Sequence, residues 1–519
     1  MNRNNLITRL KEVPEVWDFI IIGGGATGLG TAVDAASRGY KTLLLEQYDF
    51  AKGTSSRSTK LVHGGVRYLR QGNVSLVLEA LHERGLLMNN APHLVKNQSF
   101  IVPNYDWWEG PFYGIGLKIY DKLAGDLGIG PSKHLSKEET LKYIPTLESY
   151  DLNGGVIYHD AQFDDSRLAI NLLQTVFDHG GTGINYMKVT GLLKTNDKIS
   201  GVRAVDQEGG EEFEFRTKAV INATGVFTDS IRKMDDEGNK PIIQPSQGVH
   251  IVLDKSFQPG ESAIMVPKTD DGRVLFAVPW HNRIIVGTTD TPVDKPTAEP
   301  RARDEEIEFL LTHAARYLTK NPTASDVLSI FAGLRPLVSN GKDGDTSEIS
   351  RDHTLLVAPS GLVTITGGKW TTYRKMAEDT INKAMAVAGL DEREVVTGNL
   401  PIHGWTRNSD SSPYAIYGSD APELKKIAAK NEVWSRPLHP NLPYTAAEVI
   451  WAARCEMART VEDVLARRTR ALLLDARASI EMAAPVADLL VAELGYDEEW
   501  KYQQIAAYTK LAKGYLLNE

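Results

Sequence analysis

The pattern of hydrophobic and polar positions divides the chain into three kinds of segment. Near the N-terminus, an apolar run over residues 17–22 precedes a glycine-rich turn, a helical pattern over 26–38 that stops at Gly39, and a second apolar run over 41–45. Continuous apolar runs are typical of strands buried on both faces of a parallel sheet. Alternation of such strands with helices predicts an α/β domain with parallel strands.

A different pattern fills the middle of the chain. Short apolar runs separated by turns lie between about 229 and 301, and they include 249–253, 273–278 and 283–286. Runs of this kind predict an antiparallel sheet that is inserted into the first domain.

The C-terminal part follows a turn-rich segment, 401–413, which reads PIHGWTRNSDSSP and predicts a domain boundary. Beyond it, Thr445 and Glu448 form a capping-box pattern, and 460–463 repeats this start signal before an apolar helical face. These signals predict a small helical domain. The expected domains are a discontinuous first domain over 15–85, 150–228 and 345–395, an inserted domain over 86–149 and 229–344, and a helical domain over 401–519.

Composition argues against several classes of protein. The chain has 519 residues and a formal net charge of -9, so the basic footprint of a nucleic-acid-binding protein is missing. Its one cysteine, Cys455, excludes an internal disulfide and a cysteine-based metal site, and this fits a reducing cytoplasm. No apolar run reaches about 18 residues and the first residues lack the apolar stretch of a signal peptide. We therefore expect neither a membrane-spanning helix nor an export signal.

The glycine-rich turn, GGGATG over 23–28, matches the G-x-G-x-x-G pattern and stands between a strand and a helix. Glycines at these positions let backbone N–H groups approach a pyrophosphate, and the helix N-terminus adds partial positive charge. Glu46, at the end of the second strand, stands where an acid accepts hydrogen bonds from a ribose. The order of these elements predicts a dinucleotide site, and the alternative is a glycine-rich turn in an ordinary α/β protein.

The segments after the second strand favour FAD over NAD. A nicotinamide-dependent dehydrogenase is expected to continue directly into further βα units. Here the chain enters a polar loop, GTSSRSTK over 53–60, and then LVHGGVRYL over 61–69. A strand ending in INATG and a turn reading TGGKWTT follow much later.

Several motifs together resemble the FAD-dependent glycerol-3-phosphate dehydrogenase family. In chain order they are GGGATGLG, SSRSTKLVHGGVRYL, YHDAQFDDSRL, NATG, VPWHNRIIVGTTDT, LRPL, SRDHTL and GGKWTTYRKMAE, which span most of 15–380, while DVLARRTRALLLD resembles the family's cap. The resemblance implies an α/β fold: a glutathione-reductase-type FAD-binding domain with an inserted antiparallel-sheet substrate domain and a C-terminal helical cap domain. It also implies that FAD oxidises sn-glycerol 3-phosphate to dihydroxyacetone phosphate.

The resemblance further implies which residues contact the cofactor and the substrate. The expected FAD contacts are Gly23, Gly25, Ala26, Thr27, Gly28, Glu46, Ser55, Ser56, Ser58, Thr59, Lys60, His63, Gly64, Val189, Ala223, Thr224, Gly225, Gly368, Lys369, Thr371 and Thr372. A helix that begins near Thr371 is expected to stabilise the reduced, anionic flavin. The expected substrate contacts are Arg67, Tyr68, Arg335 and Lys369, with Arg351 as a weaker candidate, because guanidinium and ammonium groups hold a phosphate dianion.

His250 is the expected general base, and Arg335 is the second expected catalytic residue. A neutral imidazole suits proton removal near pH 7. His250 stands in an apolar strand, so the residues alone leave open a core histidine that is bonded to a carbonyl.

The subclass implied by the resemblance is the bacterial, membrane-associated dehydrogenase. The chain has no D-x-D-x-D-G calcium loop and no room for the long insert of the soluble oxidases. This form implies a membrane quinone as electron acceptor and a position on the cytoplasmic face of the cell membrane, and the oligomeric state stays open, a homodimer included. The aromatic residues of 105–113 fit either core packing or an interfacial contact, and the arginines of 467–470 fit either a solvated helix face or a contact with anionic lipid.

Three rival functions remain at this stage. A glycerol-3-phosphate oxidase would share nearly every residue named above and would pass electrons to oxygen. A flavin-dependent tRNA-modifying enzyme would need a basic surface studded with aromatic residues, against which the net charge speaks. A non-catalytic flavin-binding redox sensor would show no turnover with any polyol phosphate.

Overall fold

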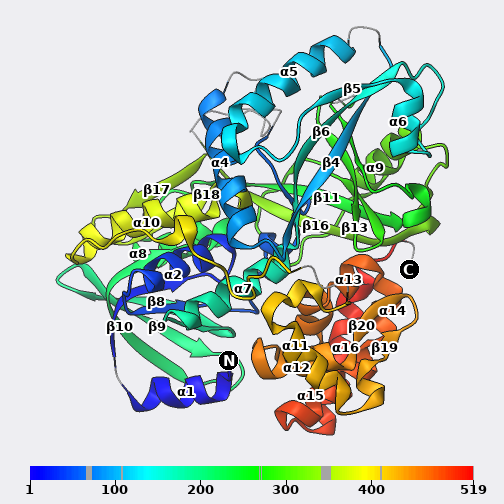
Figure 1. Ribbon diagram of the computed structural model, residues 1–519. Helices are drawn as coiled ribbons and strands as arrows, with labels where there is room; N and C mark the ends of the chain where they lie inside the picture. Colours follow the sequence, from blue (N-terminus) through cyan, green and yellow to red (C-terminus); the bar gives the residue numbers. More distant parts are fainter. Residues whose placement is uncertain are drawn as a thin grey trace.

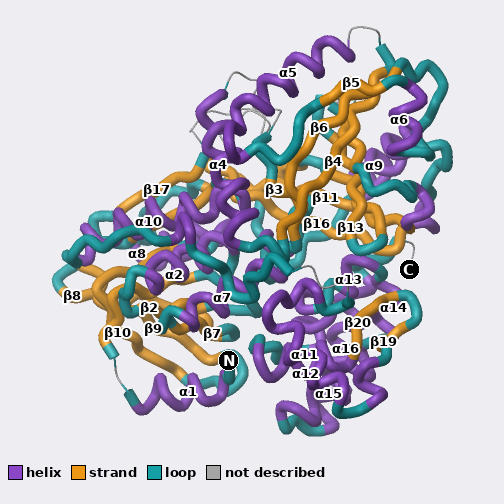
Figure 2. The backbone as a smooth tube through the Cα atoms, in the orientation of Figure 1, coloured by secondary structure: helices purple, strands orange, loops and turns teal. Residues whose placement is uncertain are grey.

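The computed structural model describes residues 1–13, 15–65, 73–106, 109–267, 269, 272–339, 352–408 and 412–517. The chain forms two large sheets and a helical C-terminal part (Figure 1). Figure 2 shows the strands gathered in the two sheet regions, whereas the C-terminal part is almost entirely helical. Among the described helices, none combines the length and the apolar character that crossing a bilayer would require.

The first sheet has the order β17-β18-β10-β1-β2-β7, with the β8–β9 hairpin joined to β10. Neighbouring strands from β18 to β7 are parallel, whereas β17 and β9 pair antiparallel. The strands are β1 Val16–Ile22, β2 Thr42–Leu45, β7 Thr182–Ile184, β8 Met187–Thr195, β9 Lys198–Asp206, β10 Glu212–Asn222, β17 His353–Val357 and β18 Val363–Gly367.

Helices cover one face of this sheet. The helices α2 Ala26–Ser37, α7 Asp165–Asp178 and α10 Tyr373–Ala388 share an apolar core with Phe19, Ile21 and Leu44 of the strands. On the other face, the β8–β9 hairpin and α1 Arg3–Glu12 pack over Ile20, Ile22 and Leu43, and α8 Thr228–Asp235 follows β10. The predicted buried strand, helix and second strand near the N-terminus are confirmed, with α2 ending one residue earlier than expected at a cap before Gly39.

The second sheet has the order β15-β11-β14-β13-β12-β4-β6-β3, with β16 paired to β11 and β5 paired to β6. Its strands are β3 Leu61–Val62, β4 Val95–Asn104, β5 Lys133–Leu135, β6 Gly154–Phe163, β11 Ile243–Asp254, β12 Ala263–Val266, β13 Leu275–Trp280, β14 Arg283–Gly287, β15 Thr291–Pro292 and β16 Val327–Val338. The helices beside it are α4 Val74–Asn90, α5 Glu109–Ala124, α6 Lys137–Tyr143 and α9 Asp304–Tyr317.

The three apolar runs predicted between 229 and 301 lie in β11, β13 and β14, which pair antiparallel as expected. The sheets differ from the expected domain limits at β6, which falls in the 150–228 segment expected in the first domain. This strand pairs with β4 along ten positions and belongs to the second sheet. It is buried at nearly every position, so its own pattern does not indicate which sheet it joins.

The C-terminal part contains α11 Ala421–Ala429, α12 Ala446–Cys455, the π-helix η11 Asp463–Arg468, α13 Ala471–Leu474, α14 Ala476–Glu481, α15 Ala483–Leu494 and α16 Glu498–Lys513, with a hairpin of β19 Pro437–His439 and β20 Leu442–Thr445. The capping box at Thr445 is confirmed, and the second start signal precedes η11. The apolar core of this part includes Val252, Trp280, Ile285 and Phe331. The helical part therefore packs against the second sheet.

Candidate active site

The glycine-rich turn joins β1 to α2, and the three glycines of its G-x-G-x-x-G pattern have different surroundings. Gly23 has a φ of +112°, and a Cβ there would lie 2.6 Å from the carbonyl oxygen of Ala223. A Cβ at Gly28 would lie 1.8 Å from the carbonyl oxygen of Gly23. These two positions need glycine for close backbone packing, whereas a Cβ at Gly25 would meet only the Ser55 hydroxyl, at 3.0 Å. Apart from its chain neighbours, no other described residue lies within 4 Å of that Cβ position, so packing does not demand glycine at Gly25, and the missing side chain would let a pyrophosphate approach the backbone.

Polar groups converge on this turn. The Glu46 carboxylate accepts hydrogen bonds from the backbone N–H of Gly24 at 2.6 Å and of Tyr48 at 2.8 Å, and burial raises the pKa of this carboxyl. The backbone N–H of Ala26 donates to the Ser55 hydroxyl at 2.9 Å. The acceptor predicted for a ribose and the first donor of the helix thus lie on either side of the turn, and these residues fit an adenosine diphosphate group.

Other expected cofactor residues lie at the same edge of the first sheet. Ala223 and Thr224 follow β10, where Thr224 donates to Asn222, and a Cβ at Gly225 would project into open space. Val189 is buried on β8 in the apolar cluster that contains the ends of β1 and β2. Thr27 is half-buried in the first turn of α2.

The polar loop after β2 sends some of its side chains inward. The hydroxyl of Ser58 and the ammonium of Lys60 both bond Asp165 at 2.7 Å, and Lys60 also donates to the carbonyl oxygen of Ser56 at 2.6 Å. Lys60 and Asp165 are fully buried. The side chains of Ser58 and Lys60 therefore tie the loop to Asp165 of α7. A cofactor contact of either residue would have to come from its backbone.

Two segments that are far apart in sequence meet beside this loop. The Trp370 indole donates to the carbonyl oxygen of Ser55 at 2.9 Å, and the Thr371 hydroxyl accepts from the backbone N–H of His63 at 3.3 Å. Thr372, the last residue of the short 3₁₀ turn Trp370–Thr372, occupies the N-cap position of α10 Tyr373–Ala388. The predicted helix start near Thr371 is confirmed, because α10 begins at Tyr373. Gly368 and Lys369 directly precede the residues that contact Ser55 and His63.

His250 and Arg335 share one face of the second sheet. Ser246 pairs with Arg335, Gly248 with Gly333 and His250 with Phe331, and directly opposed residues of an antiparallel pair point to the same side. Glycines lie on the strands between the two candidate side chains. A Cβ at Gly248 would lie 2.4 Å from Nη2 of Arg335, and a Cβ at Gly287 would lie 2.2 Å from Cδ2 of His250. The guanidinium thus extends back over Gly248 towards the imidazole.

The surroundings of His250 keep its imidazole neutral. The ring is 3% exposed and stacks on Phe331 with centroids 4.9 Å apart. Its Nε2 lies 3.0 Å from the Thr59 hydroxyl, and its Nδ1 has no hydrogen-bond partner among the residues that the structure describes. Burial, followed by the charges of Lys60 and Arg335, holds the pKa of His250 well below its usual value.

The phosphate-binding candidates are placed only in part. Arg335 contacts the Asp290 carboxylate at 3.3 Å, the Thr288 hydroxyl at 3.2 Å and the Thr289 carbonyl oxygen at 3.0 Å. Lys369 is half-buried at the turn after β18. Arg67, Tyr68 and Arg351 lie outside the described residues.

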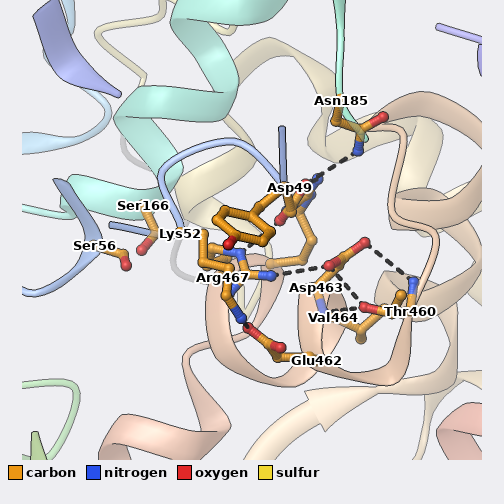
Figure 3. A network of polar contacts seen from close by, with 12 residues as sticks. Asp49, Lys52, Ser56, Ser166, Asn185, Thr460, Glu462, Asp463, Val464 and Arg467 are labelled. Carbon is orange, nitrogen blue, oxygen red and sulfur yellow. Dashed lines mark hydrogen bonds and ion pairs between the residues drawn. The ribbon is translucent and has the colours of Figure 1, made fainter. Parts of the chain in front are cut away.

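The arginines of 467–470 correct the sequence-based expectation. They form neither a solvated helix face nor a lipid contact, because Arg467, Arg468 and Arg470 are 3%, 0% and 0% exposed. Arg467 pairs with Asp49 of the first domain (Figure 3), and Arg468 pairs with the same carboxylate. Arg470 pairs with Asp164. Charged residues are almost never buried unless paired. Asp49 and Asp164 lie more than 300 residues away from these arginines in the sequence, so hydrophobic patterning could not reveal this arrangement.

A second network of buried hydrogen bonds could not be predicted from the sequence either. The Tyr120 hydroxyl of α5 accepts from the backbone N–H of Gly64 at 2.8 Å and donates to Asp160 at 2.7 Å, while Arg84 of α4 donates to Asp160 at 2.9 Å. The backbone at Gly64 is thereby fixed to α4 and α5. The motif YHDAQFDDSRL contains Asp160, but nothing in the sequence indicates its partners.

Of the aromatic stretch 105–113, Tyr105 packs edge-on against Tyr317 and donates to the carbonyl oxygen of Glu148 at 2.8 Å. Tyr113 is half-buried against the second sheet. Trp107 and Trp108 lie outside the described residues, and the side chain of Phe112 is also outside them. The described members of the stretch therefore favour the core-packing interpretation.

Comparison with protein families gives two matches. The model of FAD dependent oxidoreductases matches residues 18–374, and the model of the C-terminal domain of alpha-glycerophosphate oxidase matches 362–501. The chain is 40% identical to mitochondrial glycerol-3-phosphate dehydrogenase of Mus musculus over 98% of its own length and 75% of that protein's. It is 37% identical to the mitochondrial enzyme of Schizosaccharomyces pombe, over 95% of this chain and 86% of that protein.

Solved structures give the same result. Glycerol-3-phosphate dehydrogenase from Bacillus halodurans, complexed with FAD, superposes with a TM-score of 0.81 at 29% identity and covers 99% of this chain and 97% of that one. L-alpha-Glycerophosphate oxidase from Mycoplasma pneumoniae shares the fold, with a TM-score of 0.55 at 17% identity over 74% of this chain and 98% of that one.

Proposed function

Because the chain belongs to the glycerol-3-phosphate dehydrogenase family of FAD-dependent oxidoreductases, we propose that it oxidises sn-glycerol 3-phosphate to dihydroxyacetone phosphate and passes the electrons to a membrane quinone. One observation supports this most directly. A buried neutral imidazole, His250, and a guanidinium, Arg335, share one face of the second sheet, with glycines between them, beside the two segments that border the expected flavin position. Oxidation of a phosphorylated secondary alcohol needs a base for the hydroxyl proton and a cation for the phosphate, both within reach of a substrate that lies against the flavin.

The base removes the proton from the substrate C2 hydroxyl. His250 can accept it because its imidazole is neutral, and the contact of Nε2 with the Thr59 hydroxyl holds the ring in place. FAD, when bound, supplies the acceptor for the hydride that leaves C2. The positive charges of Lys60 and Arg335 oppose protonation of His250 in the resting enzyme and so keep the base available.

The substrate phosphate is held on the Arg335 side of the face. A planar guanidinium binds phosphate oxygens in pairs, and the Thr288 hydroxyl and the Asp290 carboxylate orient it. Lys369, together with Arg67 and Tyr68, and with Arg351 as a weaker contact, completes the proposed substrate site. The proposed FAD contacts are those of the glycine turn, Glu46, the polar loop and the 368–372 turn.

The test is anaerobic addition of sn-glycerol 3-phosphate to the purified holoenzyme. We expect the flavin absorption near its visible maximum to bleach and one dihydroxyacetone phosphate to form per flavin. The enantiomer, sn-glycerol 1-phosphate, serves as the control, because it presents its C2 hydrogen to the wrong side when its phosphate is held. An unchanged flavin spectrum with sn-glycerol 3-phosphate would reject the proposed substrate.

We place the proposed membrane contact on the exposed face of α5 rather than on the aromatic stretch 105–113, which overlaps the start of this helix. This helix lies at the end of the molecule opposite the helical C-terminal part (Figure 1). Its outer face presents exposed residues at helical spacing, apolar and basic in alternation: Ile115, Lys118, Ile119 and Lys122. A face of this kind suits an anionic bilayer surface, and this supports peripheral attachment to the cytoplasmic face of the membrane, where a quinone is available.

Vesicle flotation tests this contact. Holoenzyme should float with vesicles of phosphatidylcholine and phosphatidylglycerol, and Ile115→Asp with Ile119→Asp should remove most of the floating fraction. Val433→Asp is the matched control, because Val433 is 62% exposed against 64% for Ile115 but lies in the helical C-terminal part. Reduction of a ubiquinone analogue is measured in the same samples. Stoichiometric peroxide without quinone reduction would favour an oxidase and reject the quinone.

A further inference from the structure

The loop between Glu46 and the polar segment touches the glycine turn on several sides. Besides the Glu46 contact with Gly24, the backbone N–H of Ala51 donates to the carbonyl oxygen of Gly24 at 2.9 Å. A Cβ at Gly24 would lie 2.9 Å from both Glu46 Cβ and Phe50 Cδ1. The position of the 46–52 loop therefore sets the position of the turn that faces the adenosine diphosphate half of FAD.

Two arginines of the helical C-terminal part hold this loop. The Asp49 carboxylate, 0% exposed, accepts from Arg467 Nε at 2.6 Å and from Arg468 Nη1 and Nη2 at 2.7 Å and 2.9 Å. The amide of Asn185 lies 3.3 Å from the same carboxylate. These cations hold the pKa of Asp49 far below its usual value, so the carboxylate stays charged.

In a second ion pair between the same two segments, the loop supplies the cation and the helical part supplies the anion. Lys52, from the same loop, donates to Glu462 of the helical part at 2.5 Å, and Glu462 also accepts from Arg467 at 2.8 Å (Figure 3). The loop therefore contributes the anion Asp49 and the cation Lys52 to this contact. Residues of opposite charge in the helical part pair with each of them. Only docking of the helical part brings these partners together, because more than 400 residues separate Asp49 from Arg467 and Arg468.

We propose that Arg467 and Arg468 are positioning residues for FAD, and that the helical C-terminal domain is coupled to cofactor affinity through Asp49 and Lys52. When these pairs are intact, the loop is held against the glycine turn. When they are broken, the loop leaves that position and the turn loses its backbone partner and the Phe50 contact. The proposal depends on FAD binding at the turn and not on the identity of the substrate.

The first experiment measures affinity. Apo-protein of Arg468→Met, Arg468→Lys and Lys52→Met is titrated with FAD and, separately, with ADP. The Kd of both ligands should rise by about 5–150-fold in Arg468→Met, the range of a typical coupling between sites, with partial recovery in Arg468→Lys. Arg454→Met is the control, because Arg454 pairs with Glu493 inside the helical domain and should leave both Kd values unchanged.

The result for Lys52→Met keeps the test decisive if Arg468→Met does not fold, because Lys52 is at the rim of the network with a side chain 14% exposed. A severalfold rise in its Kd for ADP supports the coupling. A folded Arg468→Met or Lys52→Met protein that binds FAD and ADP like the wild type overturns it.

The second experiment uses reciprocity, since a ligand that gains from docking must stabilise docking equally. Saturating ADP should slow hydrogen exchange of the backbone amides in 459–470 of the wild-type apo-protein, and this protection should be smaller in Lys52→Met. Equal exchange with and without ADP would contradict the proposal. Neither experiment contains glycerol 3-phosphate, so a flavin that fails to bleach with that substrate would reject the proposed function alone.

Discussion

Replacing Gly287 by alanine tests whether the position of the His250 ring sets turnover. An added Cβ would lie 2.2 Å from Cδ2 and 2.9 Å from Nε2 of His250. The ring must therefore move by about 1 Å to restore ordinary contact, and a misplacement of that size costs about 10²-fold in rate. We expect kcat to fall by about that factor, because a displaced imidazole no longer reaches the substrate hydroxyl.

Gly248→Ala, on the neighbouring strand β11, provides the comparison. Its Cβ would lie 2.4 Å from Nη2 of Arg335, so the group proposed to bind phosphate moves instead of the proposed base. We expect this variant to raise KM more than it lowers kcat, the reverse of Gly287→Ala. Gly398→Ala is the neutral control, because a Cβ at Gly398 meets no atom within 4 Å.

The assay is steady-state dye or quinone reduction by holoenzyme whose FAD content and melting temperature have been measured for each variant. Retained FAD and a melting temperature close to that of the wild type show that a loss of rate is local. A folded, FAD-replete Gly287→Ala enzyme with wild-type kcat would refute His250 as the base, since the ring cannot keep its place beside an added methyl group.

Four other outcomes follow from the same contacts. Gly25→Val should yield apo-protein by absorption spectroscopy, because its side chain fills the space before the α2 N-terminus. Arg335→Ala should cost about 2–5 kcal/mol in kcat/KM if it leaves the substrate phosphate buried and unpaired. Because the pKa of His250 is lowered, kcat/KM corrected for substrate ionisation should stay level as pH falls through 6.5, and a midpoint at or above 6.5 would contradict this. His403 bonds a carboxylate of α7 and one of the helical domain, which raises its pKa to about 9, so it contributes up to about 3 kcal/mol of stability below pH 6.5. Denaturant unfolding should show this contribution lost as pH rises through 9, and a His403→Gln variant should lack that loss.

Much of the first sheet could be predicted because its signals are local. The apolar run of β1, the glycine turn, α2 and the stop at Gly39 follow one another within about 25 residues, and each depends on near neighbours in the chain. The placement of β6 could not be predicted in this way. Its buried pattern fits either sheet, and its pairing with β4 is decided by a strand some 50 residues earlier.

The candidate site also combines features that local sequence predicts with features that depend on distant strands. His250 and Arg335 could be named as functional candidates from motifs, but their common face depends on the pairing of β11 with β16. A slip of one residue would place one of the two side chains on the opposite side of the sheet. Two glycines make room for them. Gly287 lies inside the motif VPWHNRIIVGTTDT, but neither that motif nor the sequence around Gly248 indicates which side chains the glycines face. Their role is visible only when the side chains of neighbouring strands are in place.

The buried arginines of the helical domain explain why charge patterning failed there. The sequence of the arginines at 467–470 predicts a helix face exposed to solvent, because burying a charge without a partner is too costly. Pairing removes that cost for Arg468, but its partner Asp49 stands in another domain and its neighbours in the sequence give no sign of it. Burying charges on both sides of a domain contact makes a mismatched or undocked arrangement costly. The contact is therefore suited to report, at the glycine turn, whether the helical domain is docked.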